Sequence, residues 1–172
     1  QITVSTSFFV PKPFTPFQWA SMNTRADFLG KAYTVNHTIK DQLNRKSIKY
    51  NWHEADVTLL EGLLARGDRR VGKAILCAYK NGALYDAWSE TFQYDIWLKA
   101  LDETGISYDF YNFRERSADE LLPWDFIHIG VTRKFLEKEW ERAKQAVVTP
   151  NCRQGCSGCG GRSYGGGVCC EN

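Results

Sequence analysis

The sequence predicts an α/β fold, in which a short parallel β-sheet leads into a mainly helical region. Residues 2–10 alternate in polarity, which is the period of a β-strand, and residues 47–52 alternate in the same way. Between them, residues 24–43 carry apolar side chains at the three-to-four spacing of a helix. A strand, a helix and a second strand in this order form a βαβ unit, whose two strands pair in parallel.

The first predicted strand has two different faces. Its apolar face suits packing beneath helices, and its other face carries the small hydroxyl side chains of Thr3, Ser5 and Ser7. Such a row suits the inner wall of a barrel or cleft, where larger side chains would fill the space of a ligand. The alternative is an amphipathic strand with its hydroxyls in solvent. Prolines between residues 11 and 16 then force an extended exit from the strand.

The middle of the chain has a mostly helical pattern. Leucines at helical spacing mark a helix that Gly67 ends. Asp68 can cap the next helix, in which we expect Cys77 to be a buried, small hydrophobic residue. A further helix ends at Gly105.

The pattern changes again toward the end of the chain. Residues 106–125 form an aromatic, irregular stretch, and residues 126–130 are apolar enough for a short strand. Apolar spacing predicts a final helix over residues 132–147, with ordinary ion pairs on its exposed face.

The composition changes at Pro150. Five of the 6 cysteines and half of the 14 glycines follow that residue. We therefore expect three parts. They are the βα units over residues 1–66, a mainly helical region over residues 67–148, and a Cys/Gly-rich tail over residues 149–172.

Charge and hydropathy exclude several classes of protein. The 22 Lys and Arg residues nearly balance the 20 Asp and Glu residues, so any binding of nucleic acid would need a local basic patch. No apolar run reaches the roughly 18 residues of a membrane span, and no segment has the pattern of a secretory signal. We expect a soluble, cytoplasmic protein without a membrane partner. Because a strand pattern follows Gln1 at once, we also expect a piece of a longer chain.

The strongest chemical signal is the segment Cys152-Arg-Gln-Gly-Cys156-Ser-Gly-Cys159, which Cys169 and Cys170 follow. Glycine and serine spacers let several thiolates converge on one metal, and such a cluster in a cytosolic chain favours metal binding over disulfides. We expect the first three cysteines and either Cys169 or Cys170 to be ligands. Zinc and an iron–sulfur cluster both fit four thiolates. A redox or disulfide role and a disordered tail are the alternatives.

The spacing C-x-x-x-C-x-x-C is also that of the cluster that activates S-adenosylmethionine in radical enzymes. That motif belongs after the first strand of a barrel, where three cysteines leave one iron open. Here it lies after residue 150 with further cysteines to close the site. We therefore expect a closed, auxiliary or structural metal site.

Three arginines, Arg66, Arg69 and Arg70, surround the predicted helix break at Gly67. Guanidinium groups and helix-start amides together could bind a phosphate or a carboxylate. The alternative is a capping Asp68 with arginines that are solvated or paired within the protein. The three histidines have no ligand spacing, so we expect them at helix starts or on the surface.

Six segments of the chain occur in an order that is typical of one family. They are Val4-Ser-Thr-Ser-Phe-Phe-Val-Pro-Lys-Pro-Phe-Thr-Pro-Phe-Gln-Trp19, Leu64-Ala-Arg-Gly-Asp-Arg-Arg70, Asp86-Ala-Trp-Ser-Glu90, Leu122-Pro-Trp-Asp125, Gly130-Val131, and a final segment of the form T-P-[DN]-C-R…C…C-G…C. Together they resemble the radical S-adenosylmethionine proteins that carry an N-terminal cobalamin-binding-like domain. The resemblance covers nearly the whole chain.

The resemblance implies that the chain is the C-terminal part of such an enzyme. The cobalamin-like domain, the early barrel strands and the activating three-cysteine motif would lie upstream. This chain then supplies the last one or two βα units of a parallel barrel. Thr3, Ser5 and Ser7 would face the barrel interior, and Lys12 and Gln18 would lie near its mouth.

The resemblance also implies cofactors and partners. The parent enzyme would use a four-iron four-sulfur cluster and S-adenosylmethionine, and cobalamin where its upstream domain binds it. The partners of this chain would be those upstream domains and a substrate that the resemblance does not identify. Residues 160–167 look inserted relative to the usual tail, which leaves the fourth ligand open between Cys169 and Cys170. Without a correctly placed activating motif, we expect this part to be inert alone.

A second hypothesis belongs to another class of protein. The cysteines could hold a structural zinc in a binding module for RNA, which would use Arg66, Arg69, Arg70 and nearby aromatic side chains. The near-neutral net charge of +2 weighs against it.

Overall fold

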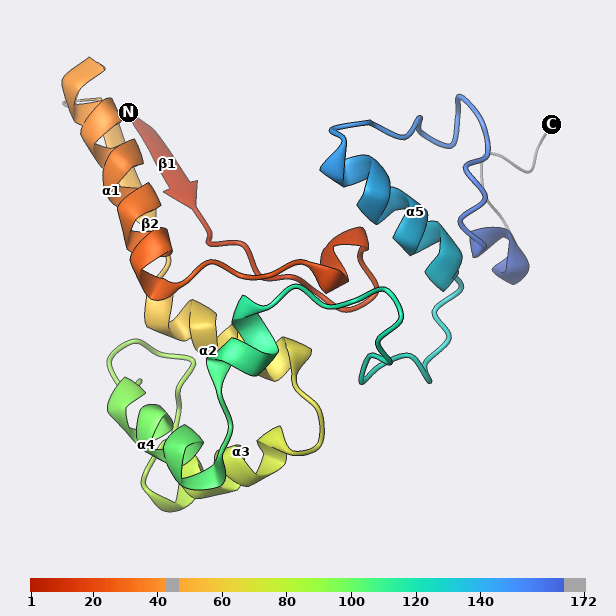
Figure 1. The fold of residues 1–172 in the computed structure, drawn as a ribbon. Coiled ribbons are helices and arrows are strands. Elements are labelled where there is room, and N and C mark those ends of the chain that lie inside the picture. Colours follow the sequence, from red (N-terminus) through yellow and green to blue (C-terminus); the bar gives the residue numbers. More distant parts are fainter. Residues whose placement is uncertain (43–46, 166–172) are drawn as a thin grey trace. The chain divides into compact units, whose positions relative to one another are not determined.

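The chain has an α/β fold, as the sequence predicts, with a small parallel sheet and several helices (Figure 1). The computed structural model describes residues 1–42 and 47–165. In chain order, its elements are β1 (Ile2–Thr6), the 3₁₀ helix η1 (Pro16–Trp19), α1 (Arg25–Gln42), β2 (Ile48–Trp52), α2 (Ala55–Arg66), α3 (Val71–Lys80), α4 (Tyr94–Thr104), the π-helix η2 (Asp109–Phe113), α5 (Arg133–Lys144) and the 3₁₀ helix η3 (Gly161–Tyr164).

The elements form two compact units. The first unit combines Gln1–Val10 with Ser21–Arg114, and the second combines Pro11–Ala20 with Glu115–Asn172. The first therefore holds the sheet and helices α1 to α4, and the second holds η1 and α5. The division into residues 1–66, 67–148 and 149–172 remains a prediction.

The βαβ unit is present as predicted. Strands β1 and β2 pair in parallel, from Ile2 opposite Ile48 to Thr6 opposite Trp52, and α1 is the crossover between them. The strand is shorter than the alternation over residues 2–10 suggests. The last hydrogen bond between the strands runs from the His53 amide to the Thr6 carbonyl oxygen, because the segment after β2 then turns into α2. Beyond Thr6, the alternation reflects side-chain packing instead.

Helix ends in the first unit follow the glycines that predict them. Helix α2 ends before Gly67, where a Cβ atom would lie 2.7 Å from the Leu63 carbonyl oxygen. Helix α4 ends at Gly105, whose φ of 65° lies in the left-handed region that glycine adopts without strain. Between these ends, α3 packs against α4, and both share one apolar core with α2. Its buried members are Leu60, Leu63, Val71, Ala74, Ala78, Ala83, Trp97, Ala100, Leu101 and Tyr111.

The second unit has a smaller core. Its buried members are Trp19 of η1, Leu122 and Trp124 of the loop before α5, and Leu136 of α5. Helix α5 begins as predicted, because the Thr132 hydroxyl oxygen accepts a hydrogen bond from the Phe135 amide at 3.3 Å.

The short strand predicted over residues 126–130 is wrong. The chain turns there, with the Ile127 amide donating to the Trp124 carbonyl oxygen at 3.0 Å. The apolar side chains of this stretch are exposed, and Phe126 is 84% accessible. In the described part of the chain, only β1 and β2 pair as strands, so this segment has no neighbouring strand to join.

Across residues 1–42 and 47–165, every helix is too short or too polar to cross a membrane.

Candidate functional site

The cysteine-rich segment follows α5. Cys152 and Cys156 are exposed, and Cys159 is half-buried. Among the described cysteines, none forms a disulfide. Cys169 and Cys170 lie outside the described residues, and with them the fourth expected ligand.

One end of this segment is fixed to the start of α5. The Thr132 amide donates a hydrogen bond of 2.8 Å to the Cys159 carbonyl oxygen. The Gly161 amide donates to the Cys159 Sγ at 3.4 Å, which is the kind of contact that stabilises a thiolate. The turn at Gly160 makes both contacts possible. Its φ is 97°, and a Cβ atom there would lie 2.7 Å from the Gly130 carbonyl oxygen.

The thiol side chains of this segment are suitable ligands for a metal, although those in its described part do not converge on one point. Within residues 1–42 and 47–165, no three His, Cys, Asp or Glu side chains converge as a metal site. The thiols of Cys152, Cys156 and Cys159 nevertheless lie in one short, glycine-rich segment, and two further thiols follow it. Soft thiolate donors of this kind select zinc or iron–sulfur clusters.

We expect Gly160→Ala to loosen the cysteine-rich segment. The new methyl group would meet the Gly130 carbonyl oxygen, and a non-glycine residue at this φ is strained, so the free energy of unfolding of the second unit should fall by about 1–3 kcal/mol. Thermal unfolding followed by circular dichroism measures this loss. Gly155→Ala is the control, because no atom beyond its two chain neighbours lies within 4 Å of its added Cβ. Equal stability of the two variants would contradict the anchoring role of Gly160.

The hydroxyl row of β1 continues as a polar face on β2. Thr3 and Ser5 are exposed, and the register places them opposite Lys49 and Asn51, which are exposed as well. The opposite face, which includes Tyr50, is half-buried. The alternation of residues 47–52 could have identified the two polar residues of β2, but their position beside Thr3 and Ser5 depends on the strand register.

Ser7 has different surroundings from Thr3 and Ser5. It lies beyond the end of β1 and lines a cavity of about 250 Å³ together with Lys31, Phe28 and Tyr50. The hydroxyls of Thr6 and Tyr50 share a hydrogen bond of 2.8 Å at this cavity.

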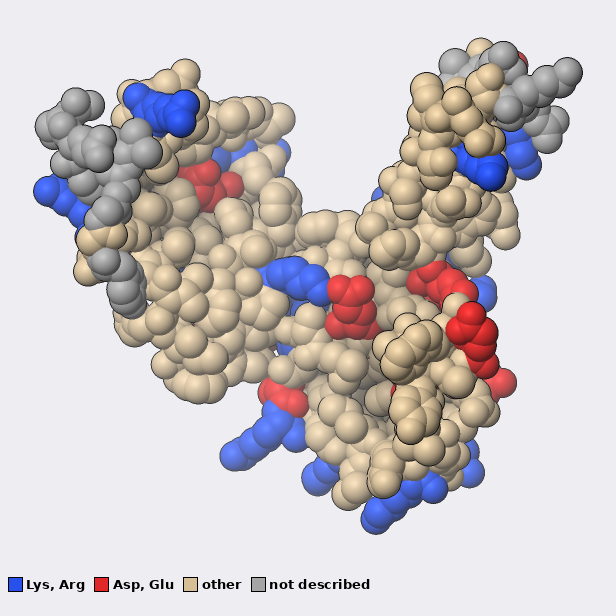
Figure 2. Space-filling view, turned by 180° about the vertical axis from the view of Figure 1, so that it is seen from behind, with Lys and Arg blue, Asp and Glu red and all other residues tan. Residues whose placement is uncertain are grey.

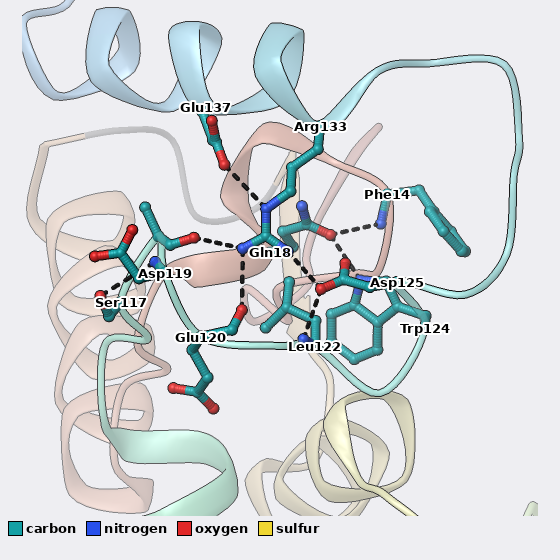
Figure 3. Close-up of polar contacts among 11 residues, drawn as sticks. Phe14, Gln18, Ser117, Asp119, Glu120, Leu122, Trp124, Asp125, Arg133 and Glu137 are labelled. Atoms are coloured by element: carbon teal, nitrogen blue, oxygen red, sulfur yellow. Dashed lines mark hydrogen bonds and ion pairs between the residues drawn. The ribbon is translucent and has the colours of Figure 1, made fainter.

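Lys12 and Gln18 belong to the second unit. Lys12 is exposed, whereas Gln18 is only 3% accessible. The Gln18 Oε1 accepts hydrogen bonds from the Trp124 Nε1 at 2.7 Å and from the Phe14 amide at 3.1 Å (Figure 3). Gln18 therefore holds the loop over residues 11–20 against the core of its own unit, and it lines a cavity of about 280 Å³ there.

Arg133 is the centre of a polar network in the second unit that sequence reasoning missed. Its guanidinium donates to the Glu137 carboxylate at 2.9 Å and to the Glu120 carbonyl oxygen at 3.0 Å, and it also reaches Asp125 and the Ala118 carbonyl oxygen (Figure 3). It thus ties the loop before α5 to the helix. No spacing in the sequence marks this role, because its partners are mainly backbone carbonyls and a loop carboxylate.

The three arginines around Gly67 have three different environments. Arg66 is fully buried, and its Nε donates to the Tyr111 carbonyl oxygen at 2.7 Å. Arg69 is exposed. Arg70 pairs with Asp68, with 2.6 Å between its Nη2 and the carboxylate oxygen Oδ2. Arg66 thus holds the core of the first unit together, while Arg69 and Arg70 lie at the surface.

The hydrogen bonds of Asp68 lead us to expect that the protein loses stability in acid. Hydrogen bonds from the Arg70 side chain lower the pKa of Asp68 to about 2 in the folded protein, with smaller contributions from the Arg70 amide and the Tyr111 hydroxyl. The pKa is lower than in the unfolded chain, so this stabilisation is present above about pH 4 and is lost as the pH falls toward 2. Asp68→Asn should therefore flatten the fall in unfolding free energy between pH 4 and pH 2.

Urea unfolding at several pH values measures this dependence. Asp102→Asn is the control, because Asp102 is an exposed carboxylate on α4. If the Asp68→Asn variant and the unsubstituted protein lose stability equally between pH 4 and pH 2, the ion pair does not stabilise the fold.

The prediction of a buried Cys77 is wrong. Cys77 is half-buried, and its Sγ donates a hydrogen bond of 3.1 Å to the Glu103 carboxylate, which raises the pKa of the thiol. Helical spacing places Cys77 at the border of the apolar face of α3, where its side chain packs partly against the core and its Sγ also meets a carboxylate on α4.

The candidate residues therefore fall into several groups within the two units. The first unit holds the polar face of the sheet, Ser7 at its cavity and the arginines around Gly67, and the second holds the cysteine segment, Lys12 and Gln18. No protein-family model, curated protein or solved structure matches this chain.

Proposed function

We propose that this chain is the C-terminal part of a radical S-adenosylmethionine enzyme, to which it contributes barrel wall and an auxiliary or structural metal site. The observation that carries the proposal is the parallel sheet of β1 and β2, which has only two strands in the described residues. Parallel sheets in proteins are usually larger and are covered on both faces. Two parallel strands are therefore best understood as part of a larger sheet.

The two faces of this sheet suit a barrel wall. Helix α1 packs against β2 on one face, where the rings of Tyr33 and Trp52 meet at 6.0 Å between centroids. The other face carries Thr3 and Ser5, with Lys49 and Asn51 beside them. An apolar layer cannot cover such a row without leaving polar groups unsatisfied, whereas a ligand-filled barrel interior can.

The motifs that carry the family resemblance have structural roles in this chain. Asp68 pairs with Arg70, Asp86 accepts a hydrogen bond of 3.2 Å from the Trp97 Nε1, and Asp125 pairs with Arg133. The first pair orders the turn before α3, and the other two each fix a loop to a helix within one unit. Such motifs identify a fold rather than a reaction, which agrees with a part that supplies scaffold while the radical chemistry takes place upstream.

The cysteine segment would hold the metal of this part. Cys152, Cys156 and Cys159 would be ligands together with Cys169 or Cys170. Four thiolates would close the site, so a bound iron–sulfur cluster would transfer electrons or stabilise the tail, and a zinc ion would only stabilise it. S-adenosylmethionine and any cobalamin would belong to the upstream part of the parent enzyme.

Metal content tests the proposed site. We expect the protein, after anaerobic reconstitution with iron and sulfide, to be brown and to hold both in stoichiometric amounts. Replacement of Cys152, Cys156 or Cys159 by serine should reduce the metal content, while Cys77→Ser should not, because Cys77 lies in α3 of the first unit. A colourless protein that binds one zinc ion tightly would indicate a structural zinc site. Full metal content in all three tail variants would refute the site.

The chain alone is not expected to cleave S-adenosylmethionine. A closed site leaves no iron free to bind that cofactor, so no 5′-deoxyadenosine should form after reduction.

The RNA-binding hypothesis gains little from the face shown in Figure 2. On that face, basic and acidic side chains lie in small, separate groups rather than in one basic field.

A further inference from the structure

A cavity of about 310 Å³ lies beside the start of α3 in the first unit. It is lined by residues at the start of α3, at the end of α4 and in the turn after it, and in η2. Arg70, Lys73, Ser107, Phe110 and Tyr111 are among its lining residues. This volume lies at the lower end of the range of small-molecule sites.

The lining of this cavity is cationic. Arg70 and Lys73 contribute two positive charges, and none of the described residues that line it is acidic. Asp68 lies behind Arg70 and balances part of its charge. In the described part of the chain, no residue forms an ion pair or a hydrogen bond with the Lys73 ammonium group, and Lys73 is exposed. The cavity therefore retains positive charge that a ligand can neutralise.

The Arg70 guanidinium is held in position before any ligand arrives. Its Nε and Nη2 donate to Asp68, and its Cζ lies 5.2 Å from the ring centroid of Phe110 and 5.8 Å from that of Tyr111. The Tyr111 hydroxyl donates to Asp68 at 3.1 Å, which fixes the carboxylate as well. The Nη1 of Arg70 is not used in the ion pair with Asp68. Because the guanidinium is already ordered, binding would cost little side-chain entropy.

We propose that this cavity binds the phosphoryl group of a phosphorylated molecule. A phosphoryl group has several acceptor oxygens that can meet Arg70, Lys73 and the Ser107 hydroxyl from different sides, whereas a carboxylate has two. The site differs from the one that the sequence suggests, since Lys73 joins Arg70 and the buried Arg66 has no part in it. It does not depend on the metal site or on the parent enzyme.

Isothermal titration at low ionic strength, in a buffer free of phosphate and sulfate, tests the proposal. We expect saturable binding of inorganic phosphate and of adenosine monophosphate. The affinity should fall about tenfold in Lys73→Gln, since one charge-assisted contact is lost. This substitution should leave the fold intact, because Lys73 is exposed. Lys80→Gln is the matched control, since Lys80 is an exposed lysine at the other end of α3, outside the cavity.

Two further titrations identify the source of the phosphoryl group. If adenosine monophosphate binds more tightly than inorganic phosphate, the natural ligand is a small phosphorylated molecule. Tighter, strongly salt-dependent binding of a short RNA that Lys73→Gln weakens assigns a nucleic-acid backbone. The proposal is overturned if neither phosphate nor adenosine monophosphate saturates the protein by about 10 mM, or if Lys73→Gln binds both as tightly as the unsubstituted protein.

Discussion

Replacing Arg66 by alanine is expected to lower the free energy of unfolding of the first unit by about 3–5 kcal/mol. Arg66 lies at the end of α2 and is 0% accessible, so its side chain fills volume inside the core. Its guanidinium also donates to the Tyr111 carbonyl oxygen at 2.7 Å, and a second contact reaches the Arg114 carbonyl oxygen. Alanine would leave a cavity and would deprive buried carbonyls of their donor.

Two variants separate the causes of this loss. Arg66→Met restores most of the volume without the donor, so we expect a loss between those of alanine and the unsubstituted protein. Arg69→Ala is the surface control, and it should change the stability by less than about 0.5 kcal/mol. Urea unfolding monitored by circular dichroism measures all three variants. A loss for Arg66→Ala as small as that for Arg69→Ala would show that Arg66 does not support the core.

Replacing Trp19 by alanine is expected to unfold the second unit. Trp19 is 0% accessible and is one of two tryptophans among the four buried members that the described residues contribute to this core. Removal of a buried tryptophan costs about 3–5 kcal/mol, which is comparable with the whole stability of a small unit. The loss should also release the loop over residues 115–117, since the Trp19 carbonyl oxygen accepts a hydrogen bond of 2.8 Å from the Arg116 amide.

Differential scanning calorimetry distinguishes the two units. In the Trp19→Ala protein, we expect the transition of the second unit to disappear while that of the first unit persists. Trp88→Ala is the control, because Trp88 is 60% accessible and belongs to the first unit. Retention of both transitions in the Trp19→Ala protein would mean that the core around Trp19 does not hold the second unit together.

Elements that depend on neighbouring residues were predictable from the sequence. The alternation of residues 2–6 and 48–52 gives the two strands, and the helical spacing between them gives the parallel connection. Gly67 and Gly105 mark helix ends because the local backbone requires glycine there, and Thr132 caps α5 through a hydroxyl only three residues from its donor.

Features that depend on distant partners were not predictable. The sequence marks Arg66 as a candidate anion ligand or as a solvated or internally paired arginine, and it does not indicate that Arg66 is buried and bonded to a carbonyl oxygen 45 residues away. Arg133 looks like an ordinary residue in the first turn of a helix, although it orders the preceding loop. Residues 126–130 are apolar enough for a strand, but no described strand lies beside them to supply hydrogen bonds.

The candidate sites divide in the same way. The cysteine segment stands out as a candidate site from its spacing alone, and its role as a metal site stays a prediction. By contrast, the position of Lys49 and Asn51 beside Thr3 and Ser5 follows only from the strand register. The place of Lys73 in the cationic cavity likewise follows only from the packing of α3 beside η2.

The most direct test of the proposed place of this chain in an enzyme is the nucleotide sequence upstream of the codon for Gln1. We predict one continuous reading frame that encodes a C-x-x-x-C-x-x-C motif after an early strand of a parallel barrel, preceded by a cobalamin-binding-like domain. A start codon immediately before Gln1, or a long upstream frame without that cysteine motif, would contradict the proposal.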